Sequence, residues 1–289
     1  MRKPFFTGTC TAMVTPFLGE QVNFPLMERL LQRQMDAGVH TVVIGGTTGE
    51  APTLTDHEKL QLYRRCKSFA GSDMKIICGT GSNDTAHAVE LSIAAQEAGA
   101  DALLVVAPYY NKGNPEGQLQ HFAAIAKSVE IPIILYNVPS RTGTDIPVSV
   151  YKTLSALPNI AGVKEASTDM VKIARIRNAC TPDFTIWSGN DDLAVAAMSL
   201  GAQGLISVVS NVIPAKTQAM TMAALNGDYH SASSMQCRLL PLIDALFREV
   251  NPIPVKEAMK RIGFDCGPCR LPLSTPSKET AEILDSLLP

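Results

Sequence analysis

Lys164 ends an apolar run, residues 160–163, and is followed by small and polar residues. Lysine is rarely buried without a partner, so a lysine that closes a core strand needs an explanation. Its stem could simply carry the charge to solvent at the end of the strand. Alternatively, an enclosed strand end would desolvate the amine and make it a nucleophile that forms a Schiff base with a ketone.

Other apolar runs also end in groups that could take part in chemistry. The glycine-rich segment 45–50 carries hydroxyls and backbone N–H groups that could cradle an anion. The set comprises Thr47 and Thr48 after the run 39–44, Tyr109 and Tyr110 after 102–106, Tyr136 and Arg141 at and after the end of 131–136, and residues 188–192 after 184–187.

The elements that would position these groups are short apolar runs that alternate with helical patterns. The runs are unbroken, as in parallel strands covered on both faces, and Asn23 and Asp84 are suitable N-caps for two of the helices between them. The alternation predicts an α/β fold, a (β/α)8 TIM barrel over residues 1–226. The predicted strands are residues 8–14, 39–44, 75–79, 102–106, 131–136, 160–164, 184–187 and 204–208.

A doubly wound open sheet is the rival fold, but it should carry a glycine-rich phosphate loop after its first strand. Here Thr15-Pro16-Phe17 follow that strand. Residues 227–289 have no strand signal and predict helices over about 228–247, 254–262 and 277–288. Because this region is too short for an independent core, we expect a helical appendage packed on the barrel or on a neighbouring subunit.

In a TIM barrel, functional groups gather at the carboxyl ends of the strands. The barrel would therefore bring an amine, phenols, hydroxyls and one guanidinium to the same mouth. That convergence favours the Schiff-base interpretation of Lys164 over a lysine that reaches solvent.

Composition excludes several other classes of protein. Of 289 residues, 46% are apolar and 18% charged, and the net charge is −2. No basic cluster, signal-like segment or membrane-length apolar run is present, so we expect neither nucleic acid nor membrane as a partner. The seven cysteines, an odd number in apolar surroundings, predict a cytoplasmic protein with reduced thiols. Cys266 and Cys269 have CxxC spacing, which fits a turn, a redox pair or a zinc site.

Four segments together resemble the dihydrodipicolinate synthase family of pyruvate-dependent class I aldolases. They are residues 45–50 (GGTTGE), 136–143 (YNVPSRTG), 162–165 (GVKE) and 251–256 (NPIPVK). The resemblance implies condensation of pyruvate with L-aspartate-4-semialdehyde to give 4-hydroxy-tetrahydrodipicolinate, in lysine (diaminopimelate) biosynthesis. It also implies no cofactor other than the covalent pyruvate imine, no metal, and a homotetramer built as a dimer of dimers.

The resemblance further implies a role for individual residues. Lys164 would form the imine, and Tyr136 would move protons through Thr47 to Tyr110, which would reach in from a neighbouring subunit. Thr47 and Thr48 would hold the pyruvate carboxylate, Arg141 would clamp the second substrate, and Gly189 and Ile206 would line the site with backbone groups.

Two alternatives remain open. One is an N-acetylneuraminate or 2-keto-3-deoxy-sugar-acid lyase of the same family, which would need hydroxyl partners for a polyol. The other is a binding barrel that has lost catalysis, although the lysine and the phenols are all present.

Many members of the family are inhibited by L-lysine at a site between subunits. The matching positions are Ala51, Lys59, Asn83, His87 and Tyr109, with Asp56 nearby. His87 replaces the acidic residue that would bind the α-ammonium group, and Lys59 adds a positive charge against a cationic ligand. We therefore expect weak or absent inhibition by lysine.

Overall fold

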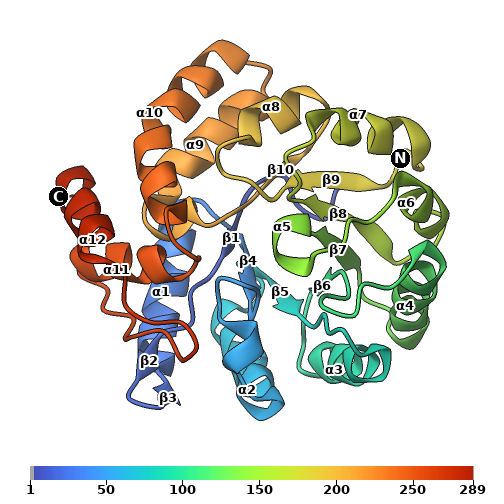
Figure 1. Cartoon of the computed structure of the whole chain (residues 1–289), viewed down its shortest axis with the longest axis horizontal. Helices are drawn as coiled ribbons and strands as arrows, with labels where there is room; N and C mark the ends of the chain where they lie inside the picture. Colours follow the sequence, from blue (N-terminus) through green and yellow to red (C-terminus); the bar gives the residue numbers. More distant parts are fainter. Residues whose placement is uncertain (1–2, 289) are drawn as a thin grey trace.

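The computed structural model describes residues 3–288. Eight parallel strands close into a barrel in the order β1-β10-β9-β8-β7-β6-β5-β4 (Figure 1). The predicted TIM barrel is confirmed, and the predicted strand bounds agree to within two residues. The strands are β1 Gly8–Ala12, β4 Thr41–Ile44, β5 Lys75–Gly79, β6 Ala102–Val106, β7 Ile133–Asn137, β8 Ile160–Glu165, β9 Thr185–Ser188 and β10 Gly204–Ser207, with a separate hairpin of β2 Phe17–Leu18 and β3 Gln21–Val22.

Helices surround the barrel and connect its strands (Figure 1). They are α1 Phe24–Asp36, α2 Asp56–Ala70, α3 Thr85–Glu97, α4 Pro115–Ser128, α5 Pro139–Thr142, α6 Val148–Leu154, α7 Met170–Ala179, α8 Ala194–Ser199, α9 Pro214–Leu225, α10 Tyr229–Phe247, α11 Ile253–Arg261 and α12 Lys278–Leu287, with 3-10 turns η1 Ala51–Thr53 and η2 Val209–Asn211. Within residues 3–288, no helix combines the length and apolarity needed to cross a membrane.

The helix ends follow from local sequence. The side chains of Asn23 and Asp84 accept hydrogen bonds from Leu26 N and Ala86 N at the starts of α1 and α3. α2 begins with a reciprocal capping box between Thr55 and Glu58. These caps satisfy N–H groups that a helix start otherwise leaves without a partner.

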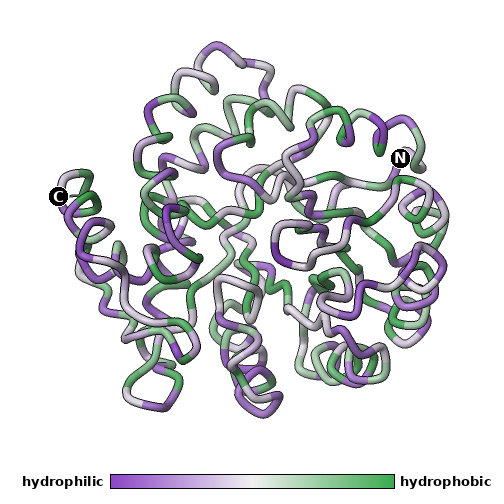
Figure 2. Tube along the Cα trace, in the orientation of Figure 1, coloured by the Kyte–Doolittle hydropathy of each residue, from purple (hydrophilic) through white to green (hydrophobic). Residues whose placement is uncertain are grey.

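Two layers of apolar side chains hold the barrel together. One layer fills the space between strands and helices, and a smaller one fills the interior. In the interior, Trp187 stacks on Phe6 with ring centroids 4.8 Å apart and donates its indole N–H to the Phe6 carbonyl. Figure 2 shows hydrophilic and hydrophobic residues alternating along the outer helices, as expected for helices with one buried face.

The three predicted C-terminal helices are present as α10, α11 and α12. α10 packs on α8 and α9, and α12 packs on α10 and α11 (Figure 1). The predicted boundary at residue 226 falls in the turn between α9 and α10. The region therefore lies against one side of the barrel, and its assignment as a unit of its own stays a prediction.

Candidate active site

β7 and β8 bring Tyr136 and Lys164 together at the carboxyl end of the barrel. The two residues are register partners across the parallel strands. Lys164 Nζ lies 4.4 Å from the centroid of the Tyr136 ring, and the residues are 5% and 6% exposed, respectively. The arrangement is the enclosed amine beside a phenol that the sequence predicted.

Lys164 differs from the other buried lysines in its lack of an acidic partner. The others form ion pairs, Lys59 with Asp56, Lys172 with Asp145 and Glu165, and Lys256 with Glu50. Lys164 forms no ion pair with any of the residues from 3 to 288. An amine that is not held in an ion pair is free to approach a carbonyl carbon in the cavity, as imine formation requires.

A cavity of about 170 Å³ surrounds Lys164. Six of the eight predicted catalytic and substrate-binding residues line it. They are Thr47, Thr48, Tyr136, Arg141, Lys164 and Gly189. The cavity thus combines a nucleophile, a phenol, hydroxyl donors and a guanidinium within reach of one small ligand.

The glycine-rich segment 45–50 carries Thr47 and Thr48 into this cavity. It packs tightly on the end of β5, since a Cβ on Gly79 would lie 2.2 Å from the Gly45 carbonyl oxygen. Thr48 is buried, and its Oγ1 accepts a hydrogen bond of 2.9 Å from Asn251 Nδ2. The segment is therefore held from the C-terminal region as well as from the barrel.

Arg141 lies on the short helix α5 at the mouth of the cavity. Its side chain is exposed, and Nη2 donates to the Asn251 carbonyl at 3.2 Å. Arg141 lines both the Lys164 cavity and a larger cleft of about 660 Å³. A guanidinium in that place can orient a carboxylate that enters from the cleft.

Gly189 lies directly beside Lys164. A Cβ there would come within 3.1 Å of Lys164 Cε and 2.6 Å of Ala166 Cβ, so a larger residue would crowd the nucleophile. Ile206 is different, because it is fully buried in the barrel interior and Val208 lines the cavity from β10's end. A lining role for the Ile206 backbone stays a prediction.

Tyr110 is not brought to the other predicted residues within one chain. It is 88% exposed and has a left-handed backbone, with φ of +70°. A non-glycine residue rarely adopts this conformation. The predicted relay from Tyr136 through Thr47 to Tyr110 is therefore not closed within a single subunit.

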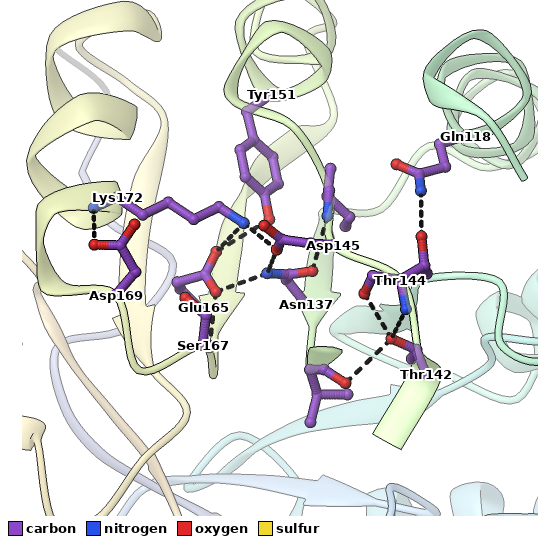
Figure 3. A network of polar contacts seen from close by, with 12 residues as sticks. Gln118, Asn137, Thr142, Thr144, Asp145, Tyr151, Glu165, Ser167, Asp169 and Lys172 are labelled. Atoms are coloured by element: carbon purple, nitrogen blue, oxygen red, sulfur yellow. Dashed lines mark hydrogen bonds and ion pairs between the residues drawn. The ribbon is translucent and has the colours of Figure 1, made fainter. Parts of the chain in front are cut away.

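Behind the site, a polar network joins Asn137 and Glu165, which are buried and directly follow Tyr136 and Lys164, to neighbouring side chains (Figure 3). Asn137 Nδ2 donates to Glu165 Oε1 and to Asp145 Oδ1, each at 2.7 Å. Glu165 Oε2 accepts from the Tyr151 hydroxyl at 3.1 Å and lies 3.6 Å from Lys172 Nζ. Because side chains alternate along a strand, this network lies on the opposite face of β7 and β8 from Tyr136 and Lys164.

The network also fixes the loop that carries Arg141. Lys172 pairs with Asp145, and Asn137 Oδ1 accepts from Ile146 N at 3.0 Å. Burial and the neighbouring Glu165 carboxylate raise the pKa of Tyr151 well above its usual value, so its hydroxyl stays a donor. The ends of β7 and β8 and the loop after β7 are thereby joined in one set of hydrogen bonds.

The five residues of the predicted lysine-type site gather in the larger cleft. Ala51, Lys59, Asn83, His87 and Tyr109 all line it. Asp56 lies between the two basic groups, with Oδ1 3.2 Å from Lys59 Nζ and Oδ2 2.8 Å from His87 Nε2. Burial opposes ionisation of Asp56, but hydrogen bonds from His87 and Lys59 outweigh it and lower its pKa.

Cys266 and Cys269 are free thiols in the structure. Burial raises the pKa of Cys266 to about 12 and that of Cys269 to about 11, so both thiols remain protonated near neutral pH. Reactive cysteines instead have lowered pKa values. Among the described residues, no group of three or more His, Cys, Asp or Glu side chains could hold a metal ion.

No role was predicted for Asn251, Asn137, Glu165 or Lys172. Asn137 and Glu165 directly follow Tyr136 and Lys164, so strand alternation could have placed them on the outer face. No local sequence pattern predicts the contact of Asn251 with Thr48, because the two positions are 203 residues apart.

Comparison with known proteins places these observations in a family. Residues 5–289 match the Dihydrodipicolinate synthetase family. A 4-hydroxy-tetrahydrodipicolinate synthase of Thermoanaerobacter sp. (strain X514) is 50% identical over 99% of this chain and 96% of its own, and one of Acetivibrio thermocellus is 45% identical over 100% and 98%. The crystal structure of dihydrodipicolinate synthase from Aquifex aeolicus superposes with a TM-score of 0.96 at 40% identity, covering 98% of this chain and 97% of that one. The chain belongs to the dihydrodipicolinate synthase family.

Proposed function

We propose that this protein is a 4-hydroxy-tetrahydrodipicolinate synthase, which condenses pyruvate with L-aspartate-4-semialdehyde in lysine biosynthesis. The observation that carries the proposal is the buried Lys164 beside Tyr136, without an acidic partner, in a cavity lined by Thr48 and Arg141. Its relatives bear that name at up to 50% identity over nearly the whole chain.

In the first step, the neutral Lys164 amine attacks the C2 carbonyl of pyruvate, and loss of one water gives the protonated imine. Hydroxyl and N–H groups of Thr47 and Thr48 hold the pyruvate carboxylate during this step. The protonated imine then acts as an electron sink, so loss of a proton from the methyl group gives an enamine. The reaction needs no cofactor beyond this covalent intermediate.

In the second step, the enamine carbon attacks the aldehyde carbon of the semialdehyde, whose carboxylate is held by Arg141. The amino group of that substrate then attacks the imine carbon, which closes the ring and releases the Lys164 amine. Tyr136 accepts and returns the protons of these steps. A positioned proton-transfer group of this kind contributes roughly 10²–10⁴-fold in rate.

We further propose a dimer in which Tyr110 completes the site of a second copy. An exposed tyrosine that lines neither cavity of its own chain suits a dimer in which it reaches the Thr47 of a second copy, and two such dimers would form a tetramer. Cytoplasmic location is expected for an enzyme with these substrates and with reduced thiols. A Tyr110→Phe variant should retain the dimer but lose activity, and full activity would contradict the relay.

Inhibition by L-lysine is expected to be weak or absent. Asp56, the acidic residue that lines the cleft, is already paired with Lys59 and His87, and Lys59 adds a positive charge against a cationic ligand. Half-inhibition at submillimolar lysine would contradict this expectation.

A coupled assay with both substrates tests the proposed function. We expect turnover with pyruvate and L-aspartate-4-semialdehyde, and none with N-acetylneuraminate. Turnover of N-acetylneuraminate alone would instead support the lyase alternative, whose polyol substrate needs hydroxyl partners.

A further inference from the structure

Asn251 connects the C-terminal region to the cavity around Lys164. It lies between α10 and α11, is 4% exposed, and lines that cavity. Its side chain donates to Thr48 Oγ1, and its carbonyl accepts from Arg141 Nη2. One residue therefore contacts both of the groups proposed to hold the carboxylates of the two substrates.

The hydrogen bond to Thr48 determines how the Thr48 hydroxyl can act. A hydroxyl has one hydrogen to donate and lone pairs with which to accept. Because Thr48 Oγ1 accepts from Asn251 Nδ2, its own hydrogen is left for another partner. Among residues 3–288, no acceptor takes that hydrogen, so it is available to an anion in the cavity.

The other end of the Asn251 amide is left without a partner. Its Oδ1 is buried and accepts no hydrogen bond from residues 3–288. A buried acceptor without a donor costs stability, so packing alone does not explain an amide at this position. Within residues 3–288, the side chain makes one hydrogen bond, the one to Thr48.

We propose that Asn251 is a positioning residue that holds the Thr48 hydroxyl as a donor toward the carboxylate of the keto acid. The inference rests on the proposed function, since it assumes that the keto acid bound beside Lys164 carries that carboxylate. The C-terminal region is then part of the binding site for the first substrate.

The isosteric variant Asn251→Asp tests this role. A carboxylate only accepts, so the Thr48 hydroxyl would turn to donate to it and be lost to the substrate. We expect the KM for pyruvate to rise roughly 10- to 100-fold, as for the loss of a hydrogen bond to a charged group, with a smaller change in kcat. Asn251→Ala leaves the hydroxyl hydrogen free, so its KM should rise only about 3-fold.

A purely structural role predicts the opposite order, because Asp fits the space of Asn and Ala leaves a void. The proposal would therefore be overturned if Asn251→Asp raised the KM for pyruvate no more than Asn251→Ala does. Thermal unfolding of both variants, with the exposed Asn226→Asp as the matched control, separates lost stability from lost binding.

A double-mutant cycle separates hydroxyl orientation from simple charge repulsion. In a Thr48→Val background, Asn251→Asp should change the KM for pyruvate less than about 3-fold, since no hydroxyl remains to turn. If Asn251→Asp still raised the KM for pyruvate about 10-fold in that background, charge repulsion would explain the weaker binding and the proposal would be contradicted.

Imine formation distinguishes this inference from the proposed function itself. Borohydride should trap pyruvate on the wild-type protein and trap it more slowly on Asn251→Asp at low pyruvate. Failure of the wild type to form an adduct would overturn the proposed function. Equal trapping by both proteins would overturn only the role of Asn251.

Discussion

Lys164 and Glu165 are adjacent in the sequence and could pair if their side chains lay on the same side of the backbone. In β8 they point to opposite faces, and Glu165 bonds to Asn137 and Tyr151 outside the barrel interior. The strand therefore directs the carboxylate of the next residue away from the Lys164 amine. This separation leaves the Lys164 amine facing the cavity and Tyr136, with no ion pair to any residue from 3 to 288.

Arg141→Lys tests the clamp on the second substrate. A guanidinium binds a carboxylate with two parallel hydrogen bonds, whereas an ammonium holds charge without fixing orientation. We expect kcat/KM for L-aspartate-4-semialdehyde to fall roughly 10- to 100-fold, the loss of about 1.4–2.8 kcal/mol. Imine trapping with pyruvate should stay unchanged, and near-normal turnover of the semialdehyde would refute the clamp.

Among single residues, those that end or follow a strand and line the cavity could be predicted from the sequence. Thr47, Tyr136, Arg141 and Lys164 were predictable because a barrel gathers strand ends at one mouth. Asn251 was not, because nothing local links position 251 to Thr48. The predicted backbone role of Ile206 rested on resemblance alone and has no geometric support in the cavity lining.

Among the elements, the pair β7 and β8 does most to position the site. Their register sets Tyr136 opposite Lys164, and the Asn137–Glu165 hydrogen bond lies on the other face of the same pair. Lys172, from α7, supplies the counter-charge for Glu165 and Asp145. We therefore expect the position of Lys164 to depend on side chains on the opposite face of the two strands.

Replacing Lys172 with Met tests this dependence. Glu165 would remain buried with its counter-charge removed, which typically costs about 3–5 kcal/mol. We expect that loss in urea unfolding, together with reduced turnover in the folded fraction. Lys152→Met on α6, an exposed lysine, is the matched control and should change neither quantity. Unchanged stability of Lys172→Met would contradict a structural role for the network.

The regular elements were predictable because apolar runs and helix caps are local signals. The short β2–β3 hairpin and α5 were not predicted, since two to four residues carry no periodicity. The network behind β7 and β8 was missed for another reason. Its members come from four elements and loops that only the closed barrel brings together.

For the whole molecule, a buried ion pair joins the barrel to the C-terminal region. Lys256 Nζ lies 2.9 Å from Glu50 Oε1, and Glu50 Oε2 accepts from Arg270 N at 2.8 Å. Glu50 ends the segment that carries Thr47 and Thr48. This pair therefore connects segment 45–50 to α11 and the following loop.

Lys256→Met should destabilise the protein by about 3–5 kcal/mol, because the Glu50 carboxylate would stay buried and lose its partner. The double variant Lys256→Met/Glu50→Gln removes the uncompensated charge and should recover part of that loss. Urea unfolding of the three proteins measures both effects. A double variant no more stable than Lys256→Met would contradict this account of the pair.

Low pH should weaken a second contact between the C-terminal region and the barrel, the ion pair of Arg270 with Glu58 on α2. Hydrogen bonds from Arg270 lower the pKa of Glu58 from about 4.5 to about 2. A carboxyl whose pKa is lower in the folded state stabilises the fold above its unfolded value and loses that contribution as pH falls toward 2. Between pH 4.5 and 2.5, wild-type stability should therefore fall more steeply than that of Arg270→Met. If the free energies of unfolding of the two proteins fell in parallel with pH, the ion pair of Arg270 with Glu58 would contribute nothing to stability.

The sequence predicted the barrel and its appendage but not how the appendage reaches the site. Contacts such as Lys256 with Glu50 join positions far apart in the chain and leave no local pattern. Tyr110 is exposed in the single chain, and its contact with a second subunit stays a prediction.

The most direct test of the account is covalent trapping of pyruvate with borohydride, followed by peptide mass mapping. We expect one reduced adduct per chain, on Lys164, no adduct in Lys164→Ala, and an unchanged adduct in Lys127→Ala, which removes an exposed lysine. An adduct elsewhere, or none on the wild-type protein, would contradict the assignment of Lys164 as the imine-forming nucleophile.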